Sequence, residues 1–194
     1  MNPYVSFGLA MCAIVSISLF LTAYMAVVFN RRAKADMLEA LTPLANLLDG
    51  EVDLDEARAA GRYKGHIAEG RAANATEGPG RVFLTTVIDG AGGNPWTFTA
   101  RRPKEAERPV AVTLIGPSEP SDQAFSESVG GVALPLLTAP GWLRIVYDPT
   151  PGHVELSRPM ATRRDIPAPK TFEAQLDALV AIAGINRARQ HSET

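Results

Sequence analysis

Three histidines are the first side chains to consider for catalysis or metal binding, because imidazole titrates near neutral pH and ligates transition metals. They are His66, His153 and His191, and none belongs to H-E-x-x-H or another tight metal-binding pattern. His66 and Glu69 have the i, i+3 spacing that joins two ligands on a helix. Their surroundings favour a β-strand, however, where this spacing points two side chains to opposite faces. The sequence therefore predicts no metal site.

The nucleophiles of acyl-transfer enzymes are absent as motifs. The one cysteine, Cys12, lies in an apolar segment, and no serine stands in G-x-S-x-G. A lone cysteine also excludes an intramolecular disulfide and a multi-cysteine metal site. We predict no catalytic residue and no cofactor, and hence a protein that is not an enzyme. The alternative is a membrane-tethered enzyme of unrecognised type, with polar groups converging from the β-rich region.

Charge argues against a nucleic-acid partner. The chain has 19 Lys and Arg against 21 Asp and Glu, and its net charge of −2 provides no basic field. Four basic residues, Arg101, Arg102, Lys104 and Arg108, lie close together. Two glutamates interrupt this cluster and no aromatic residue lies within it, which is typical of a solvated loop. An acidic partner or a lipid head group is the alternative. No pattern indicates a small-molecule substrate.

The first thirty residues predict a single transmembrane helix. No charged residue occurs before Arg31, and the apolar run from Tyr4 to Phe29 reaches about 39 Å as a helix, against about 30 Å of bilayer hydrocarbon. A cleaved secretory signal is the alternative, but such signals have a positive start and a shorter apolar core. We therefore expect residues 1–30 to be an uncleaved anchor in the lipid bilayer.

Basic residues at the end of this run predict its orientation. Arg31, Arg32 and Lys34 follow the apolar stretch, and positive charge stays on the cytoplasmic side of a membrane. We expect the N-terminus outside and the C-terminal domain in the cytoplasm, at a cell (inner) membrane and in a protein of bacterial style. A domain exposed outside the cytoplasm, acting in the cell envelope, is the alternative.

One face of the predicted anchor suits contact with another helix. Gly8, Cys12 and Ser16 recur every four residues, so their small side chains line one side of a helix and allow close approach. Chance is the competing explanation, because small residues are common in membrane helices. We expect a helix-docking face here, with another membrane protein as the partner.

Residues 31–50 predict a juxtamembrane helical stem. Met37, Leu41, Leu44 and Leu48 form one apolar face, which we expect to pack on the chain's own domain. The membrane surface and a partner helix are the alternatives. Pro43 removes a helical hydrogen bond and is expected to kink or divide the stem. Asp49 and Gly50 then supply a stop and a turn.

Residues 51–190 predict an α+β domain. Asp53 and Glu56 match a capping box for a short helix through Ala60. Beyond it, 13 of the 15 prolines lie between Pro79 and Pro169, which favours strands over long helices. The expected strands are Gly65 to Ala73, Arg81 to Asp89, Pro95 to Arg101, Val110 to Ile115, Trp142 to Asp148 and His153 to Ser157.

Turns and helices complete this domain. We expect a hairpin through the glycine-rich residues 89–94 and a second through 149–152. The segment from Ser121 to Thr138 reads as a short helix and loop. An amphipathic helix should begin with Thr171 as its N-cap and bury Phe172, Leu176 and Leu179, before a flexible polar tail at 191–194.

The expected fold class is thus α+β: a single transmembrane helix and helical stem, then a small, mainly antiparallel β-sheet closed by a C-terminal amphipathic helix. The expected function is that of a single-pass, membrane-anchored binding or accessory protein. We expect it to assemble or stabilise a membrane protein complex without catalytic activity.

Overall fold

The computed structural model describes residues 3–75, 80–88, 93–103, 110–115, 122–150 and 152–192. The chain divides into two units, Met1–Glu39 and Ala40–Thr194, and each is described here by itself. A long helix, α1 (Pro3–Leu47), forms the first unit and begins the second. The second unit continues with a β-sheet and two further α-helices, so the predicted α+β class is confirmed.

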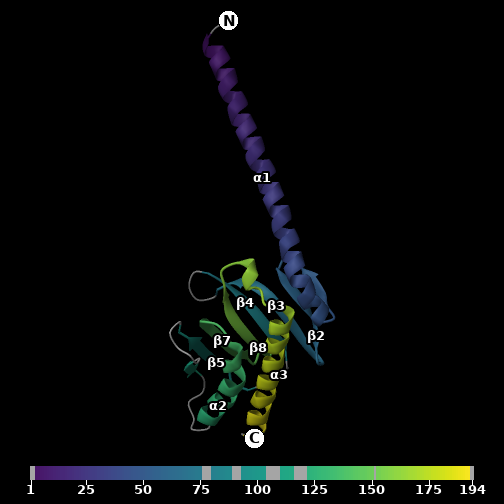
Figure 1. Cartoon of the computed structure of the whole chain (residues 1–194), viewed down its shortest axis with the longest axis vertical. Helices are drawn as coiled ribbons and strands as arrows, with labels where there is room; N and C mark the ends of the chain where they lie inside the picture. Colours follow the sequence, from purple (N-terminus) through teal and green to yellow (C-terminus); the bar gives the residue numbers. More distant parts are fainter. Residues whose placement is uncertain are drawn as a thin grey trace. The chain divides into compact units, whose positions relative to one another are not determined.

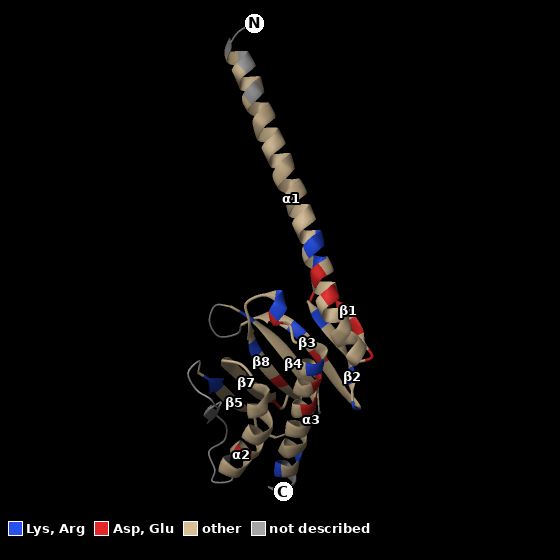
Figure 2. Ribbon diagram, in the orientation of Figure 1, with Lys and Arg blue, Asp and Glu red and all other residues tan. Residues whose placement is uncertain are grey.

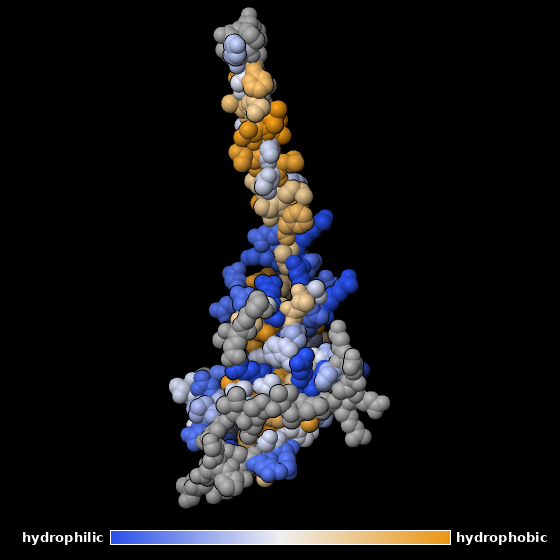
Figure 3. All heavy atoms as spheres, turned by 90° about the vertical axis from the view of Figure 1, so that its left-hand side faces the viewer, coloured by the Kyte–Doolittle hydropathy of each residue, from blue (hydrophilic) through white to orange (hydrophobic). Residues whose placement is uncertain are grey.

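The part of α1 in the first unit exposes its apolar side chains. Apart from the half-buried Val28, the large apolar residues from Tyr4 to Phe29 whose burial is described are 45–84% exposed, and Figure 3 shows this stretch as a run of orange side chains. Figure 2 shows no charged residue along it before the first arginines. By length and composition, α1 is the one helix among the described residues that is able to cross a membrane.

In the second unit, the end of α1 packs on the sheet. Leu41, Leu44 and Leu48 are fully buried, which confirms that the apolar face of the stem packs on the domain at these positions. The helix is not divided at Pro43, since buried residues on both sides hold it in place. The Leu48 carbonyl accepts a hydrogen bond of 2.6 Å from the Arg62 N–H, and the predicted stop at Asp49 is confirmed.

The sheet has eight strands in the order β1-β2-β3-β4-β8-β7-β5-β6, and every neighbouring pair is antiparallel. Figure 1 shows the central strands β4 and β8 between the outer ones. The strands are β1 (Glu51–Asp53), β2 (Arg58–Tyr63), β3 (His66–Asn74), β4 (Arg81–Ile88), β5 (Trp96–Arg102), β6 (Val110–Ile115), β7 (Gly141–Asp148) and β8 (His153–Met160).

The short helix predicted from Asp53 to Ala60 is wrong. These residues form the β1–β2 hairpin, in which Glu51 pairs with Ala60. The Asp53 Oδ1 atom does accept hydrogen bonds from the N–H groups of Asp55 and Glu56, at 3.0 and 3.2 Å. The same bonds cap a helix or close a turn, and here Ala57 adopts a positive φ of 49° that ends the turn instead of continuing a helix.

One predicted hairpin is wrong and the other is confirmed. β4 and β5 are not paired across the glycine-rich segment, because β8 and β7 lie between them in the sheet; residues 89–92 of that segment lie outside the described residues. β7 and β8 do form a hairpin, in which the Gly152 N–H donates to the Asp148 carbonyl at 2.9 Å. Gly152 has a φ of 80°, which suits glycine at this turn.

Two helices cover one face of the sheet. α2 (Asp122–Ala133) and α3 (Pro169–Ser192) lie side by side, and α3 packs on β4 and β8 (Figure 1). α2 continues into the 3₁₀-helix η1 (Leu134–Leu136), as the predicted helix and loop require, and η2 (Arg163–Asp165) precedes α3. α3 begins at Pro169, so Thr171 lies in its first turn and the N-cap prediction is wrong. Ser192, in the predicted tail, is still helical.

The core lies between this sheet face and the helices. Alternate residues of the strands point toward α3, so one side of each strand is apolar and buried. Phe172, Leu176 and Leu179 of α3 are fully buried against them, as predicted. The buried inward-facing residues of the central strands are Phe83, Thr85, Val87, Val154, Leu156, Leu143, Ile145, Tyr147, Trp96, Phe98 and Ala100.

Candidate functional site

The site residues predicted on α1 lie along the exposed part of that helix. Gly8, Cys12 and Ser16 are exposed in the first unit, spaced four residues apart on one helix face. A side chain at Gly8 would meet nothing within 4 Å, which leaves room for a second helix. Arg31, Arg32 and Lys34 follow on the same helix, immediately after the apolar stretch.

The two strand histidines do not come together. His66 pairs with Tyr63 at the β2–β3 turn, and His153 pairs with Ile88 and Asp148. His66 is two residues from the inward-facing Ala68 and so lies on the inner face of the sheet, whereas His153 is next to the inward-facing Val154 and so lies on the outer face. The two histidines are therefore on opposite faces. Within the described ranges, no group of three His, Cys, Asp or Glu residues is placed to hold a metal ion. His191 lies on α3, and its side chain is outside the description.

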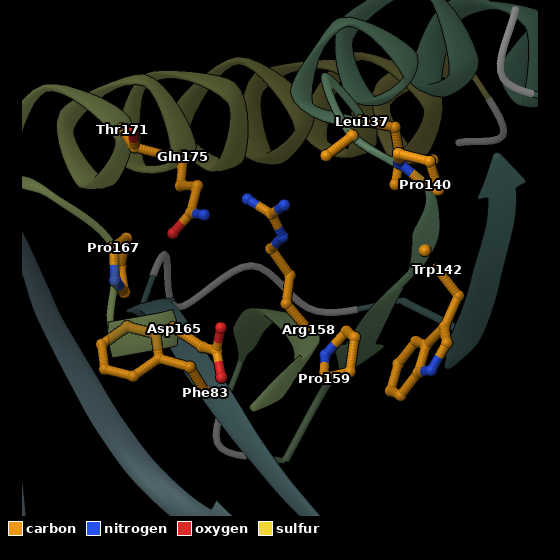
Figure 4. Close-up of a pocket in the computed structure, with 12 residues that line it drawn as sticks. Phe83, Leu137, Pro140, Trp142, Arg158, Pro159, Asp165, Pro167, Thr171 and Gln175 are labelled. Atoms are coloured by element: carbon orange, nitrogen blue, oxygen red, sulfur yellow. The ribbon is translucent and has the colours of Figure 1, made fainter. Parts of the chain in front are cut away.

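The second unit contains a pocket of about 330 Å³ between the sheet and the start of α3. Figure 4 shows that its walls come from separate parts of the chain, with β4 and β8 below and α3 above. Its lining residues are Phe83, Leu137, Ala139, Pro140, Gly141, Trp142, Arg158, Pro159, Asp165, Pro167, Thr171 and Gln175. Apolar groups predominate, with a few polar side chains, which is the usual make-up of a ligand site.

Arg158 is the one arginine in this lining, and its setting is unusual. It occupies an inward-facing position of β8, in line with the buried Val154, Leu156 and Met160. Figure 4 shows its guanidinium pointing from β8 towards α3, inside the pocket. Burial lowers the pKa of Arg158 below its usual value. Nevertheless, arginine stays charged in proteins. A cation is thus held in a mostly apolar pocket.

No described residue compensates this charge. The structure gives the Arg158 guanidinium no hydrogen bond and no ion pair within the described ranges. Most partly buried arginines pair with a carboxylate or with carbonyl oxygens, because an unpaired buried charge is costly. Within the described part of the chain, the guanidinium therefore has N–H groups available for an acceptor that enters the pocket.

Gln175 adds a second donor. It is only 1% exposed, and its Oε1 atom accepts a hydrogen bond of 2.9 Å from the buried Thr85 hydroxyl. This bond fixes the amide so that its Nε2 group points from α3 towards the sheet (Figure 4). Among the residues described, Nε2 has no acceptor. Arg158 and Gln175 thus both present unfilled N–H groups to the pocket.

Asp165 contributes a carboxylate that is already engaged. Its Oδ2 atom accepts hydrogen bonds from the N–H groups of Ala161 and Thr162, at 3.0 and 2.6 Å, and from the Thr162 hydroxyl at 3.2 Å. These bonds, the Thr162 N–H first, hold the pKa of Asp165 below its usual value. The carboxylate is therefore ionised at neutral pH and makes the surroundings of the pocket less attractive to a second negative charge.

Arg102 positions another wall of the pocket. Its Nη1 group donates to the carbonyl oxygens of Leu137 and Thr138, at 3.1 and 2.8 Å, and so ties the loop between η1 and β7 to β5. We predicted Arg102 as part of a solvated basic loop, and its role is instead structural. Two other members of that cluster, Lys104 and Arg108, lie outside the described residues.

A polar cluster on the other side of α3 serves a different purpose. The Tyr63 hydroxyl and the Lys64 ammonium both donate to Asp177 Oδ1, at 2.7 and 2.6 Å, and join the β2–β3 turn to α3. The Lys64 bond lowers the pKa of Asp177, and the Asp177 bond raises the pKa of Lys64. Burial raises the pKa of Tyr63. Asp177 Oδ1 already accepts from both donors, so we interpret this cluster as a structural contact between α3 and the sheet.

The pocket was not predicted from the sequence, although one signal pointed to it. In the segment from His153 to Met160, every second residue is apolar except Arg158, so strand alternation alone places an arginine on the buried face. The sequence could not indicate Gln175 in the same way, since a glutamine on an amphipathic helix is ordinary. Similarity offers no further guide to the ligand, because the chain matches no protein-family model, no curated protein and no solved structure.

Proposed function

We propose that this chain is a single-pass, membrane-anchored binding protein that serves as an accessory component of a membrane protein complex. Its task is to assemble or stabilise that complex, and it has no catalytic activity. The observation that carries the proposal is the exposed apolar surface of α1, on which the large side chains described from Tyr4 to Phe29, except that of Val28, are 45–84% exposed. A surface of this size is stable in a bilayer and costly in water.

The membrane partner is supported by the small-residue face of α1. Gly8, Cys12 and Ser16 place small residues at every fourth position of one helix face, which favours close packing of a second helix. The orientation is supported by Arg31, Arg32 and Lys34, which favour a cytoplasmic location for the domain. The sheet domain would then bind on the cytoplasmic side, in keeping with its pocket.

Purification of the full chain from membranes in a maltoside detergent tests this function. We expect proteins to co-purify in a fixed ratio, and we expect Cys12→Ile together with Ser16→Ile to remove at least one of them. The matched control is Ala13→Ile together with Ser18→Ile, which adds similar bulk to other parts of the helix surface. A chain that purifies alone, or partners retained equally by both variants, would contradict the proposed helix docking.

An enzyme is the second candidate, and it is favoured by the pocket alone. Catalysis needs a group that transfers a proton or attacks a substrate at the site. The described lining offers the Thr171 hydroxyl and the engaged carboxylate of Asp165, with no histidine or cysteine beside them. The geometry therefore supports binding better than it supports turnover.

A further inference from the structure

We propose that the pocket around Arg158 binds a single carboxylate carried on an apolar group, with the Arg158 guanidinium and the Gln175 amide holding the carboxylate. This inference deepens the proposed function by assigning a ligand class to the sheet domain. The experiment below measures ligand binding in the pocket, so its outcome does not depend on whether α1 docks on another membrane helix.

The unpaired charge of Arg158 calls for an anion. A guanidinium presents N–H groups in a planar fork that matches the two oxygens of a carboxylate. In this structure the fork lies in a pocket, beside fully buried apolar residues of β8 such as Leu156, and no described residue fills it. A carboxylate entering the pocket supplies the missing countercharge to a half-buried guanidinium, where the attraction is stronger than in open water.

The Gln175 amide requires that the ligand group beside it be a hydrogen-bond acceptor. With the Gln175 Oε1 atom occupied by Thr85, the amide offers only N–H groups to the pocket. A ligand that carries its own donor at this point would leave two donors facing each other, which is unfavourable. The two unfilled donors therefore select an oxygen acid over an amine or an amide.

The charge of the surroundings favours one negative charge over two. Arg158 is the one cation in the described lining, and the ionised Asp165 lies in the same lining. A phosphate dianion would bring a second charge without a partner, whereas a carboxylate balances the single guanidinium. Phosphate is therefore the less suitable ligand.

The remaining walls favour an apolar group next to the carboxylate. The apolar lining on the same side as the guanidinium includes Phe83, Leu137 and Pro167, and the pocket volume of about 330 Å³ admits a ring-sized group. Two sources offer this chemistry: a small organic acid, and the terminal carboxylate of a peptide that ends in an apolar residue.

The test uses the full chain in maltoside micelles, labelled with 5-fluorotryptophan. Its two tryptophans give two ¹⁹F signals. Trp142 lies at the edge of the pocket, at the start of β7, whereas Trp96 is buried with its indole N–H bonded to Asn186 and serves as the internal reference; Trp142→Phe assigns the signals. Phenylacetate should shift the Trp142 signal saturably. Phenylacetamide, its uncharged counterpart, should bind at least about tenfold more weakly.

Titrations with further ligands distinguish the two sources of the carboxylate. Tighter binding of N-acetyl-alanyl-phenylalanine than of phenylacetate assigns the site to a peptide terminus, and the reverse order assigns it to a small acid. Inorganic phosphate should bind more weakly than either. Phosphate binding as tight as that of phenylacetate, equal binding of the acid and the amide, or no saturable shift with any carboxylate would overturn the proposal.

Variants of the arginine connect the signal to the residue. Arg158→Met should lose at least about tenfold in affinity, and Arg158→Lys should lose less, because it keeps the charge without the fork. The matched control, Arg62→Met, removes an exposed arginine from β2 and should bind as the parent does. Phenylacetate should also raise the Tm of the parent but not that of Arg158→Met.

The unfolding temperature of Arg158→Met distinguishes a ligand-binding arginine from one that stabilises the fold. Because the uncompensated guanidinium destabilises the pocket, Arg158→Met should unfold at a higher temperature than the parent. Unchanged affinity in Arg158→Met would overturn the proposal. If Arg158→Met fails to fold, Arg158→Lys decides the question. The proposal survives if this variant keeps the Trp96 signal of the parent and still binds phenylacetate more tightly than phenylacetamide; otherwise Arg158 has only a structural role.

Discussion

Phe172 of α3 occupies the space that a side chain at Gly70 of β3 would need. A carbon added at Gly70 would lie 2.9 Å from two atoms of the Phe172 ring and 3.0 Å from the Phe83 ring. The two rings pack edge to face, with centroids 6.2 Å apart and planes at 80°. The first turns of α3 therefore sit directly on the sheet.

Gly70→Ala should destabilise the domain. Both rings are buried and cannot move aside, so the added methyl group overpacks the core, which costs about 1–3 kcal/mol. Denaturant unfolding of the full chain in micelles, followed by tryptophan fluorescence, measures the change. Gly184→Ala is the control, because a carbon there meets nothing within 4 Å and should stabilise α3 by about 0.5–1 kcal/mol. Equal stability of the two variants would disprove the close contact.

Asn186→Ala should destabilise the domain by about 1–3 kcal/mol, because it leaves the buried indole N–H of Trp96 without an acceptor. In the parent this group donates to Asn186 Oδ1 at 3.1 Å. Trp96 also packs between Phe125 and Tyr147, with ring centroids 5.3 and 6.0 Å away. A double-mutant cycle with Trp96→Phe separates the hydrogen bond from this packing. If the two losses add without coupling, the hydrogen bond contributes nothing.

Strand positions were predictable where β-forming residues are concentrated. β4, β6 and β7 begin and end within a residue or so of their predicted limits, because these segments are rich in β-branched, aromatic and other apolar residues. β1 and β2 were missed, since β2 reads Arg-Ala-Ala-Gly-Arg-Tyr and lacks a strong β-former before Tyr63. The aspartate ahead of it, Asp53, makes the hydrogen bonds of a helix cap within a turn.

Sheet order was beyond the reach of local patterns. The glycine-rich segment after β4 resembles a hairpin turn, yet β4 pairs with β8, in the register Thr85 to Leu156. Such a pairing depends on which strand completes the core beneath α3, and nothing near β4 in the sequence encodes it. The pocket is hidden for the same reason, since Phe83, Trp142, Arg158 and Gln175 meet only once this order is formed.

Asp177→Asn should lower stability at neutral pH but not in acid. The pKa of Asp177 is depressed, chiefly by its bond from Lys64, so its contribution is present above the unfolded pKa of about 3.9. It is lost as the pH falls through the lower, folded value. The gap between parent and variant should therefore close below about pH 4, as measured by denaturant unfolding from pH 3 to 8.

The size of this gap should also depend on salt. The side chains of Asp177 and Lys64 are 47% and 59% exposed, so solvent screens their attraction and the gap should be small. Glu173→Gln removes another exposed carboxylate from α3 and controls for the change in net charge. A gap that stays constant down to pH 3 would show that Asp177 acts through its shape instead of its charge.

Neutralising Arg31, Arg32 and Lys34 together should disturb the orientation of the anchor. With glutamine at these positions, the C-terminal side of α1 loses the positive charge that favours the cytoplasm. Part of the population should then place the C-terminus outside. A reporter active only in the cytoplasm, fused after Thr194, should lose activity, while one active only outside should gain it.

The matched control replaces three exposed cations of the domain, with Arg62→Gln, Arg164→Gln and Lys170→Gln in one chain. It removes the same charge but leaves the residues beside the apolar stretch unchanged, so the parent orientation should persist, because only charges close to the ends of a membrane helix set its direction. Reporters that respond equally to both variants would make net charge the cause. An external C-terminus in the parent would overturn the cytoplasmic placement of the domain, and its pocket would then face ligands of the cell envelope.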